Sequence, residues 1–271
     1  MAPTEVFAPA KINLTLHVTG LRADGYHLLE SLVVFADVGD VVRLEPAPEM
    51  ALRVTGPMAG GVPEDAGNLC WRAAQAFGEP VSIELEKHLP AAAGIGGGSS
   101  DAAAVLRGME QVFDRAFAGD ALALGADVPV CLAAEAARMS GIGEVVEPVA
   151  LPRLHAVLVN PRVEVSTPLV FKALPRKDNP PMGAVPNAGL AALLRWLGES
   201  RNDLQDPAIS LQPVIARVLT ALEQTGAELA RMSGSGATCF GLYLSREEAE
   251  LAARGLQLAY PDWWVVASDL G

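Results

Sequence analysis

Basic residues are scarce in this sequence. Among its 271 residues, 20 are lysine or arginine and 32 are aspartate or glutamate, so the formal net charge is -12. Proteins that bind nucleic acid or anionic lipid broadly need a positive field around them. The charge therefore argues against both kinds of partner. Any anionic small molecule must be held by groups concentrated at one place.

Long apolar runs and paired cysteines are missing as well. Every apolar window is broken by glycine, proline or a charge before membrane-spanning length, and the N-terminal MAPTEVFAPAK lacks a basic segment followed by an apolar one. The cysteines, Cys70, Cys131 and Cys239, lie far apart in apolar surroundings, which favours buried thiols. We therefore expect a cytoplasmic protein without a membrane partner, with one large domain or two ordinary ones.

Glycine, by contrast, is concentrated in residues 89–106, LPAAAGIGGGSSDAAAVL. Glycine lets backbone amides close on a ligand and permits the positive φ angles that turn successive amides toward one point. We expect Ser99 or Ser100 to N-cap the helix that follows and Asp101 to favour its first turn. A loop of free amides that leads into a helix is an anion site, and phosphate is the usual anion.

Three other interpretations of this stretch are weaker. A Walker loop ends in Gly-Lys-Ser/Thr, but no lysine stands next to Ser99. A dinucleotide-binding loop needs glycine or alanine at Ser99 and an acidic residue after a following strand, whereas Asp114 ends a helical run. A flexible linker would have disorder-like flanks, yet the apolar alternation of a strand precedes the glycines.

The pattern Pro-x-x-x-Gly-Ile-Gly-Gly-Gly-Ser-Ser resembles the central motif of the galactokinase, homoserine kinase, mevalonate kinase and phosphomevalonate kinase superfamily. The resemblance implies ATP with Mg²⁺ as cofactors, and an ATP-binding loop made of Pro90, Ala91, Ala92, Ala93, Gly94, Ile95, Gly96, Gly97, Gly98, Ser99 and Ser100. It also implies that Asn68 and Lys87 lie at the adenine pocket. Asn68 has a second interpretation as the N-cap of a helix over residues 69–77.

The N-terminal segment alternates between apolar and polar residues over positions 7–18, which predicts a strand. Its polar face is either solvated or part of a site, and carries Lys11, Asn13, Thr15 and His17. A turn at residues 22–25 then leads to Tyr26 and His27. The string FAPAKINLTLHVTGLRADGYHLLES resembles the N-terminal signature of the isoprenoid-pathway member of the superfamily, a kinase that phosphorylates the 2-hydroxyl of a cytidine-diphosphate-linked sugar alcohol.

Two residues are candidates for the chemistry. The segment Leu-Gly-Ala-Asp-Val-Pro, residues 124–129, resembles the segment that carries the catalytic aspartate of the superfamily, so Asp127 is our candidate to accept the hydroxyl proton. Asp127 also fits a helix N-cap with Pro129 in the first turn. An ammonium beside this carboxylate would favour the ionised forms and offset charge on the γ-phosphate, and Lys11 is our candidate.

The second half of the chain predicts a strand over residues 154–159, a short helix capped by Ser166 or Thr167, helices over 188–197 and 213–224, and then strand, glycine loop, strand, helix and strand. This order suggests a ferredoxin-like fold. The glycine loop, residues 232–238, resembles the third motif of the superfamily, with a plain glycine hairpin as the alternative. The substrate-binding residues that we expect are Asn13, Tyr26, His27, Thr167, Pro168, Phe171, Gly234, Ser235 and Gly236.

In that substrate site we expect Tyr26 and Phe171 to form two walls around a cytidine base, with His27 and Asn13 as hydrogen-bonding groups. The sequence departs from the family pattern at Ala92 and Ala93, which stiffen the loop, and at Val33, where an aromatic residue often lines the substrate wall. These departures predict a slightly stiffer loop and a less snug pocket.

Together these features predict an α+β fold of two lobes. The first, residues 1–150, is a ribosomal-S5-like α/β lobe for ATP binding and catalysis; the second, residues 151–271, is ferredoxin-like and contributes to the substrate cleft. Within the first we expect short strands at 32–35, 41–44 and 52–54 joined by turns at 37–40 and 46–48, a helix ending near 112, a helical piece from 120 and a hairpin over 138–149.

The function that we expect is that of an ATP-dependent small-molecule kinase, acting as a monomer or weak homodimer. One rival is another small-alcohol kinase of the superfamily, whose acceptor carries no nucleotide. The other is a catalytically silent ATP-binding regulator, against which the presence of both Lys11 and Asp127 argues.

Overall fold

The structure, a computed structural model, describes residues 3–91 and 93–271. The chain divides into two compact units, each assembled from three separate segments. The first unit contains the N-terminal segment up to Lys11, Val38–Ala91 and Gly96–Ala134, and the second contains Ile12–Asp37, a short segment ending at Ile95, and Glu135–Gly271. The two compact units are not consecutive halves of the chain, so the domain limits 1–150 and 151–271 stay a prediction.

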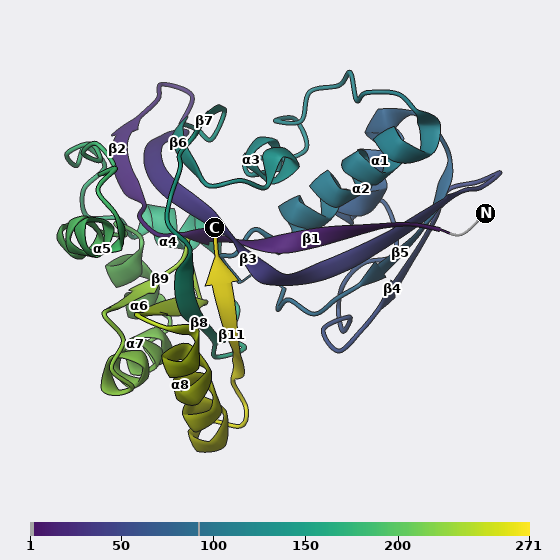
Figure 1. The fold of residues 1–271 in the computed structure, drawn as a ribbon. Coiled ribbons are helices and arrows are strands. Elements are labelled where there is room, and N and C mark those ends of the chain that lie inside the picture. Colours follow the sequence, from purple (N-terminus) through teal and green to yellow (C-terminus); the bar gives the residue numbers. More distant parts are fainter. Residues whose placement is uncertain (1–2, 92) are drawn as a thin grey trace. The chain divides into compact units, whose positions relative to one another are not determined.

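The first unit is a small sheet with helices (Figure 1). Its elements are β1 (Thr4–Asn13), β3 (His27–Pro46), β4 (Ala51–Thr55), α1 (Leu69–Phe77), β5 (Val81–Glu86), α2 (Gly97–Phe113) and α3 (Val128–Ala133), of which β1 and β3 continue into the second unit. Strand β5 pairs in parallel with β4 and antiparallel with β3. Helix α2 is buried without interruption from Ser100 to Leu106, as expected of a helix packed on every side.

Several local predictions for this unit are confirmed. Helix α1 begins after Asn68, whose Oδ1 accepts from the backbone N–H of Cys70 at 2.9 Å, and it ends at Gly78. Strands β4 and β5 and the end of α2 also lie where the sequence predicted them. Asp127 takes the N-cap position of α3, with a proline in the first turn.

Two predictions for the first half of the chain are wrong. The expected strands at 32–35 and 41–44 belong to one continuous strand, β3, which runs through the expected turn at 37–40. Within it the buried carboxylate of Asp40 accepts hydrogen bonds from backbone N–H groups. The expected helical piece from Asp120 is a series of turns instead, in which Leu124 and Gly125 donate to carbonyls three residues earlier. A bond to the third preceding residue closes a turn without propagating an α-helix.

The second unit has the expected ferredoxin-like arrangement. Its further elements are β2 (His17–Leu21), β6 (Ala137–Gly141), β7 (Val145–Pro148), β8 (Leu154–Asn160), α4 (Thr167–Lys172), α5 (Leu190–Glu199), α6 (Gln205–Leu211), α7 (Val214–Gln224), β9 (Leu229–Met232), β10 (Cys239–Tyr243), α8 (Arg246–Ala259) and β11 (Trp264–Leu270). The order β11-β8-β10-β9 is antiparallel throughout, with α7 before β9 and α8 before β11. This is the β-α-β-β-α-β pattern, with α4, α5 and α6 inserted after its first strand.

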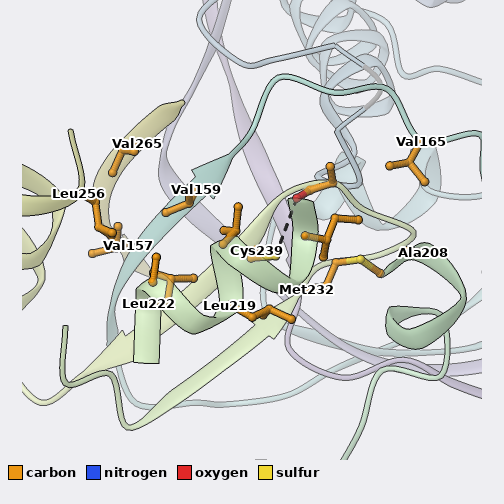
Figure 2. Packing of buried hydrophobic residues seen from close by; sticks show 14 of the residues in the cluster. Val157, Val159, Val165, Ala208, Leu219, Leu222, Met232, Cys239, Leu256 and Val265 are labelled. Atoms are coloured by element: carbon orange, nitrogen blue, oxygen red, sulfur yellow. Dashed lines mark hydrogen bonds between the residues drawn. The ribbon is translucent and has the colours of Figure 1, made fainter. Parts of the chain in front are cut away.

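Helices α7 and α8 share one core with these strands (Figure 2). Val157 and Val159, alternate residues of β8, pack with Leu222 of α7 and Leu256 of α8. Cys239 lies in the same core, and burial raises the pKa of its thiol. All three cysteines are buried and unpaired, as predicted. In the described part of the chain, no helix combines the length and apolarity needed to cross a bilayer.

The predicted strand over residues 7–18 is interrupted. Strand β1 ends at Asn13 and β2 begins at His17, because the amide of Leu16 turns to the carbonyl of Arg201. All four residues of its polar face are buried, with at most 4% of their surface exposed, and the solvated alternative is therefore wrong; they are Lys11, Asn13, Thr15 and His17.

Candidate active site

The glycine motif positions the start of α2 in the first unit. Gly96 is the N-cap residue with φ at 64°, and a Cβ on it would lie 3.0 Å from Cε of Lys11. Only glycine adopts this left-handed conformation readily while leaving room for the lysine beside it. The prediction that Ser99 or Ser100 caps the helix is wrong, since both lie inside its first turn, and the N–H of Ser100 already donates to the carbonyl of Gly96.

The first amides of α2 have no acceptors within the helix, and the helix dipole adds positive potential at that end. Gly97, Gly98 and Ser99 supply these amides, and their side chains are absent or small. Such a helix start binds anions, phosphate included. The central motif therefore forms a glycine-rich helix start as the sequence predicted, and phosphate binding there stays a prediction.

Lys11 and Asp127 meet in the same unit. The Lys11 Nζ lies 2.8 Å from Oδ2 of Asp127; the lysine side chain is 4% exposed and the aspartate side chain 35%. Although Asp127 takes the N-cap position of α3, its side chain makes no capping hydrogen bond. Its carboxylate is directed to the lysine instead, with one edge open to solvent.

This ion pair belongs to the end of α2 that carries the free amides. The Lys11 side chain passes Gly96, and the segment before Asp127 approaches Ser99, because a Cβ on Gly125 would lie 3.8 Å from the Ser99 hydroxyl. An ammonium, a carboxylate and a helix N-terminus therefore gather at one place. Phosphoryl transfer requires these elements: positive groups for the phosphates and a carboxylate for the acceptor hydroxyl.

Lys87 is part of a buried ion-pair cluster. Its Nζ donates to Oδ2 of Asp101 at 2.7 Å and to Oδ2 of Asp40. Burial alone would lower the pKa of Lys87, but the carboxylates of Asp101 and Asp40 outweigh it, and the pKa is raised. Burial raises the pKa of Asp101 well above the ordinary range. The sequence singled out Lys87 but missed Asp40, which we had placed in a turn, and the pairing of Asp101.

In the second unit, the loop between β9 and β10 contacts the central motif. Ser233 Oγ donates to the carbonyl of Gly94 at 2.9 Å and accepts from the N–H of Asn13 at 3.0 Å. The N–H of Thr238 donates to the carbonyl of Ala93 at 3.1 Å. Three stretches that the sequence identified separately are thus joined by hydrogen bonds. Sequence reasoning missed Ser233 itself, which stands directly before the predicted Gly234.

The predicted acceptor residues are partly brought together. The rings of His27 and Phe171 lie 4.7 Å apart between centroids at 31°, and the hydroxyls of Thr167 and Ser235 lie 2.7 Å apart. Burial, aided by the charge of Lys177, lowers the pKa of His27. The Tyr26 residue is 60% exposed. Hence the ring packed on Phe171 is that of His27, and a wall formed by Tyr26 stays a prediction.

The remaining predicted residues occupy varied environments. Asn68 uses Oδ1 for the α1 cap and donates from Nδ2 to the carbonyl of Pro63. Pro168 lies in the first turn of α4, and Asn13 donates from Nδ2 to the hydroxyl of Ser31 while its Oδ1 is buried without a partner. Pro90 and Ile95 are buried and Ala91 is exposed. Ala92 lies outside the described residues.

Comparison with known proteins identifies relatives along nearly the whole chain. A family model described as the GHMP kinases N terminal domain matches residues 68–143, and one described as GHMP kinases C terminal matches residues 184–262. The chain is 56% identical over 268 residues to the 4-diphosphocytidyl-2-C-methyl-D-erythritol kinase of Paracoccus denitrificans, covering 97% of this chain and 95% of that protein.

It is also 57% identical over 273 residues to the kinase of the same name from Dinoroseobacter shibae, covering 99% of this chain and 95% of that protein. Among solved structures, the crystal structure of a 4-(cytidine 5'-diphospho)-2C-methyl-D-erythritol kinase is 38% identical, with a TM-score of 0.81 and coverage of 98% of this chain and 99% of that one. Sequence and fold thus indicate the same relatives.

Proposed function

We infer that this chain, which belongs to the GHMP kinase family and within it to the 4-diphosphocytidyl-2-C-methyl-D-erythritol kinases, transfers the γ-phosphoryl group of ATP to the 2-hydroxyl of 4-diphosphocytidyl-2-C-methyl-D-erythritol. This reaction would place it in the non-mevalonate isoprenoid precursor pathway. The observation that carries the mechanism is the 2.8 Å pair of Lys11 and Asp127 beside the start of α2.

In this mechanism Asp127 binds the acceptor hydroxyl and takes its proton at a carboxylate oxygen. The partly exposed side chain leaves an edge for the substrate, and Lys11 orients the carboxylate. As the acceptor oxygen bonds to the γ-phosphorus and the bond from that phosphorus to ADP breaks, the ammonium would offset charge on the transferring group. The amides of α2 would hold the remaining phosphate oxygens. The residues of the chain thus position the reacting groups and stabilise the charge that develops during transfer.

The Mg²⁺ that we expect with ATP fits a site of this kind. Mg²⁺ keeps several waters and binds phosphate oxygens, so it needs few protein ligands. The described part of the chain holds no group of three His, Cys, Asp or Glu residues suited to a metal cage. The residues at the start of α2, with Lys11 and Asp127, fit an ion that arrives bound to the nucleotide. There the ion would neutralise phosphate charge.

The acceptor side of the proposal depends on residues of the second unit. An aromatic surface and a half-buried imidazole suit a cytosine base, which stacks on rings and presents hydrogen-bonding groups along its edge. We therefore propose Phe171, His27 and Tyr26 for the base, and Asn13, Thr167 and Pro168 with the loop 234–236 for the rest of the acceptor. Binding in a cleft between the predicted lobes, a cytoplasmic location and a monomer or weak homodimer stay predictions.

A turnover assay tests the proposal directly. Purified protein with Mg²⁺ and ATP should phosphorylate the cytidylylated sugar alcohol, and mass spectrometry of the product should show one added phosphoryl group. The matched acceptor is 2-C-methyl-D-erythritol 4-phosphate, which lacks the cytidine moiety. Equal turnover of both would favour a kinase for a simpler alcohol, and no turnover of either would contradict the assignment.

A further inference from the structure

The cluster of Asp40, Lys87 and Asp101 lies at the glycine loop but has no part in the mechanism above. It connects three elements of the first unit: Asp40 lies in β3, Lys87 directly follows β5, and Asp101 lies in the first turns of α2. All three are at most 3% exposed. The cluster is therefore inaccessible to a bulky acceptor, and any effect on catalysis must act through neighbouring groups.

Asp40 holds the chain where it enters the glycine loop. Its Oδ1 accepts from the backbone N–H groups of His88 at 2.6 Å and Leu89 at 2.9 Å, and its Oδ2 accepts from Lys87 Nζ. One fully buried carboxylate thus binds three successive residues directly before Pro90. Charge-assisted bonds of this kind are stronger and geometrically more specific than neutral ones.

Lys87 connects this entrance to the helix at the other end of the loop. Its Nζ donates to Asp101, and a Cβ on Gly97, the first residue of α2, would lie 3.7 Å from that nitrogen. The backbone of Lys87 is held as well, because its N–H donates to Thr55 and its carbonyl accepts from Met58. The carboxylates use two of the three donors of the ammonium. One donor remains for the nucleotide expected at Lys87.

A purely stabilising role fits Asp101 poorly. Its Oδ1 is buried and has no hydrogen-bond partner among residues 3–91 and 93–271. Burying a carboxyl oxygen in this way costs free energy, and ion pairs in the interior often stabilise a fold no more than apolar residues of similar size. Two further titratable side chains interact electrostatically with the cluster: Cys70 of α1 with all three members, and Cys131 of α3 with Asp101. The exposed His88 ring contacts Glu86 instead.

We propose that Asp40 and Asp101 are positioning residues for the nucleotide, which fix both ends of the phosphate loop and orient the Lys87 ammonium without touching ATP themselves. The inference rests on ATP being the phosphoryl donor, as proposed above. Because the two carboxylates act on the loop and on Lys87, their loss should weaken nucleotide binding and leave acceptor binding nearly unchanged.

The test compares Asp40→Asn, Asp101→Ala and Asp101→Asn with the wild-type protein. We expect KM for ATP, and Kd for Mg-ADP measured by calorimetry, to rise about tenfold in Asp40→Asn and Asp101→Ala, since small misplacements of binding groups have effects of this size or larger. Asp101→Asn keeps an oxygen for Lys87 and should recover most of the affinity. KM for the acceptor should change less than about twofold.

The matched control is Asp269→Asn. Asp269 also belongs to a partly buried ion-pair group, with His155 and Arg246, but it lies in β11 of the second unit. This variant should lose stability without a change in nucleotide affinity. All constants are measured well below the Tm of each variant, and if Asp40→Asn does not fold, the two Asp101 variants carry the test.

The outcomes separate this inference from the proposed function. Wild-type protein that binds Mg-ADP but does not phosphorylate the acceptor would contradict the function, while the Kd values would still test the cluster. Unchanged KM for ATP and Kd for Mg-ADP in Asp101→Ala would overturn the inference. So would a lowered Tm with KM for ATP and acceptor raised equally, because that result indicates a merely structural role.

Discussion

Two lysine–aspartate groups lie at the same end of α2, and they differ in how much water reaches them. In the first, Lys11 pairs with Asp127, whose side chain is 35% exposed. In the second, Lys87 pairs with Asp40 and Asp101, whose side chains are 0% and 4% exposed. Both lysines are almost fully buried, so the difference lies in the carboxylates.

The difference in exposure separates a carboxylate that can take part in the reaction from carboxylates that hold the surrounding structure. A carboxylate with an open edge can receive a substrate hydroxyl, whereas one enclosed by donors or by apolar atoms can only hold what surrounds it. Enclosure also changes the energetics, because an exposed ion pair contributes little to stability while breaking a buried one leaves an uncompensated charge. We therefore expect substitutions in the first group to affect turnover and those in the second to affect stability and nucleotide binding.

The largest expected effect follows from Asp127→Asn. This change keeps the shape and an oxygen for Lys11 but removes the base, so kcat should fall by roughly 10²- to 10⁴-fold, the usual contribution of general-base catalysis. The Kd for Mg-ATP should stay within about twofold, because Asp127 does not bind the phosphates in this mechanism. Steady-state kinetics and calorimetry give the two values.

The control for this prediction is Asp203→Asn, which alters a partly exposed pair with Arg201 in the second unit and should leave kcat unchanged. If kcat of Asp127→Asn stayed near that of the wild type, Asp127 would at most orient the hydroxyl. The two lysine groups would then not differ in their effect on turnover.

The second prediction concerns stability. Asp40→Asn removes a fully buried charge that accepts three hydrogen bonds, and we expect it to lower the free energy of unfolding by about 3 kcal/mol. Asp127→Asn, at the more exposed pair, should cost less than about 1 kcal/mol. Urea-induced unfolding measures both. Equal losses would mean that exposure of the carboxylate does not distinguish the two groups.

That the glycine loop, Lys11 and Asp127 belong to one candidate site could be predicted from sequence, for a physical reason. All three lie in short contiguous motifs, whose residue types suit the local conformation and the chemistry of phosphate. The assignment of an acceptor rested on the resemblance of the N-terminal string. These inferences needed no knowledge of which distant segments meet.

What sequence could not provide is the set of partners across the fold. Asp40 reads as a turn residue beside glycine, and only the continuous ladder of β3 with β5 shows that it faces Lys87. In the sequence Ser233 is an ordinary serine in a glycine loop. The structure shows that its hydroxyl is hydrogen-bonded to the N–H of Asn13 and the carbonyl of Gly94. Such contacts join residues 47 to 220 positions apart, which no local pattern encodes.

A third prediction tests how tightly Lys11, the proposed catalytic lysine, is held. Gly96→Ala places a Cβ 3.0 Å from Lys11 Cε at a φ of 64°, so either the helix start or the lysine must shift. We expect kcat to fall roughly tenfold. Gly255→Ala in α8 is the matched change, because a Cβ there meets nothing within 4 Å, and it should leave kcat unchanged. Equal kcat values for the two variants would show that the start of α2 tolerates a side chain.

The smallest effect is a dependence of stability on pH that arises from Asp101 in the buried group. Burial raises the pKa of Asp101 to about 8, with Asp40 acting in the same direction and Lys87 against it. In the unfolded chain this carboxyl titrates near its ordinary pKa of about 3.9. The stabilising effect of its proton is therefore complete below about pH 4 and is lost as the pH rises toward about 8. Asp101→Asn has no such proton, so its free energy of unfolding, measured in urea, should fall less than that of the wild type over this range. A wild-type slope in Asp101→Asn would mean that the Lys87 ammonium outweighs burial and holds Asp101 ionised.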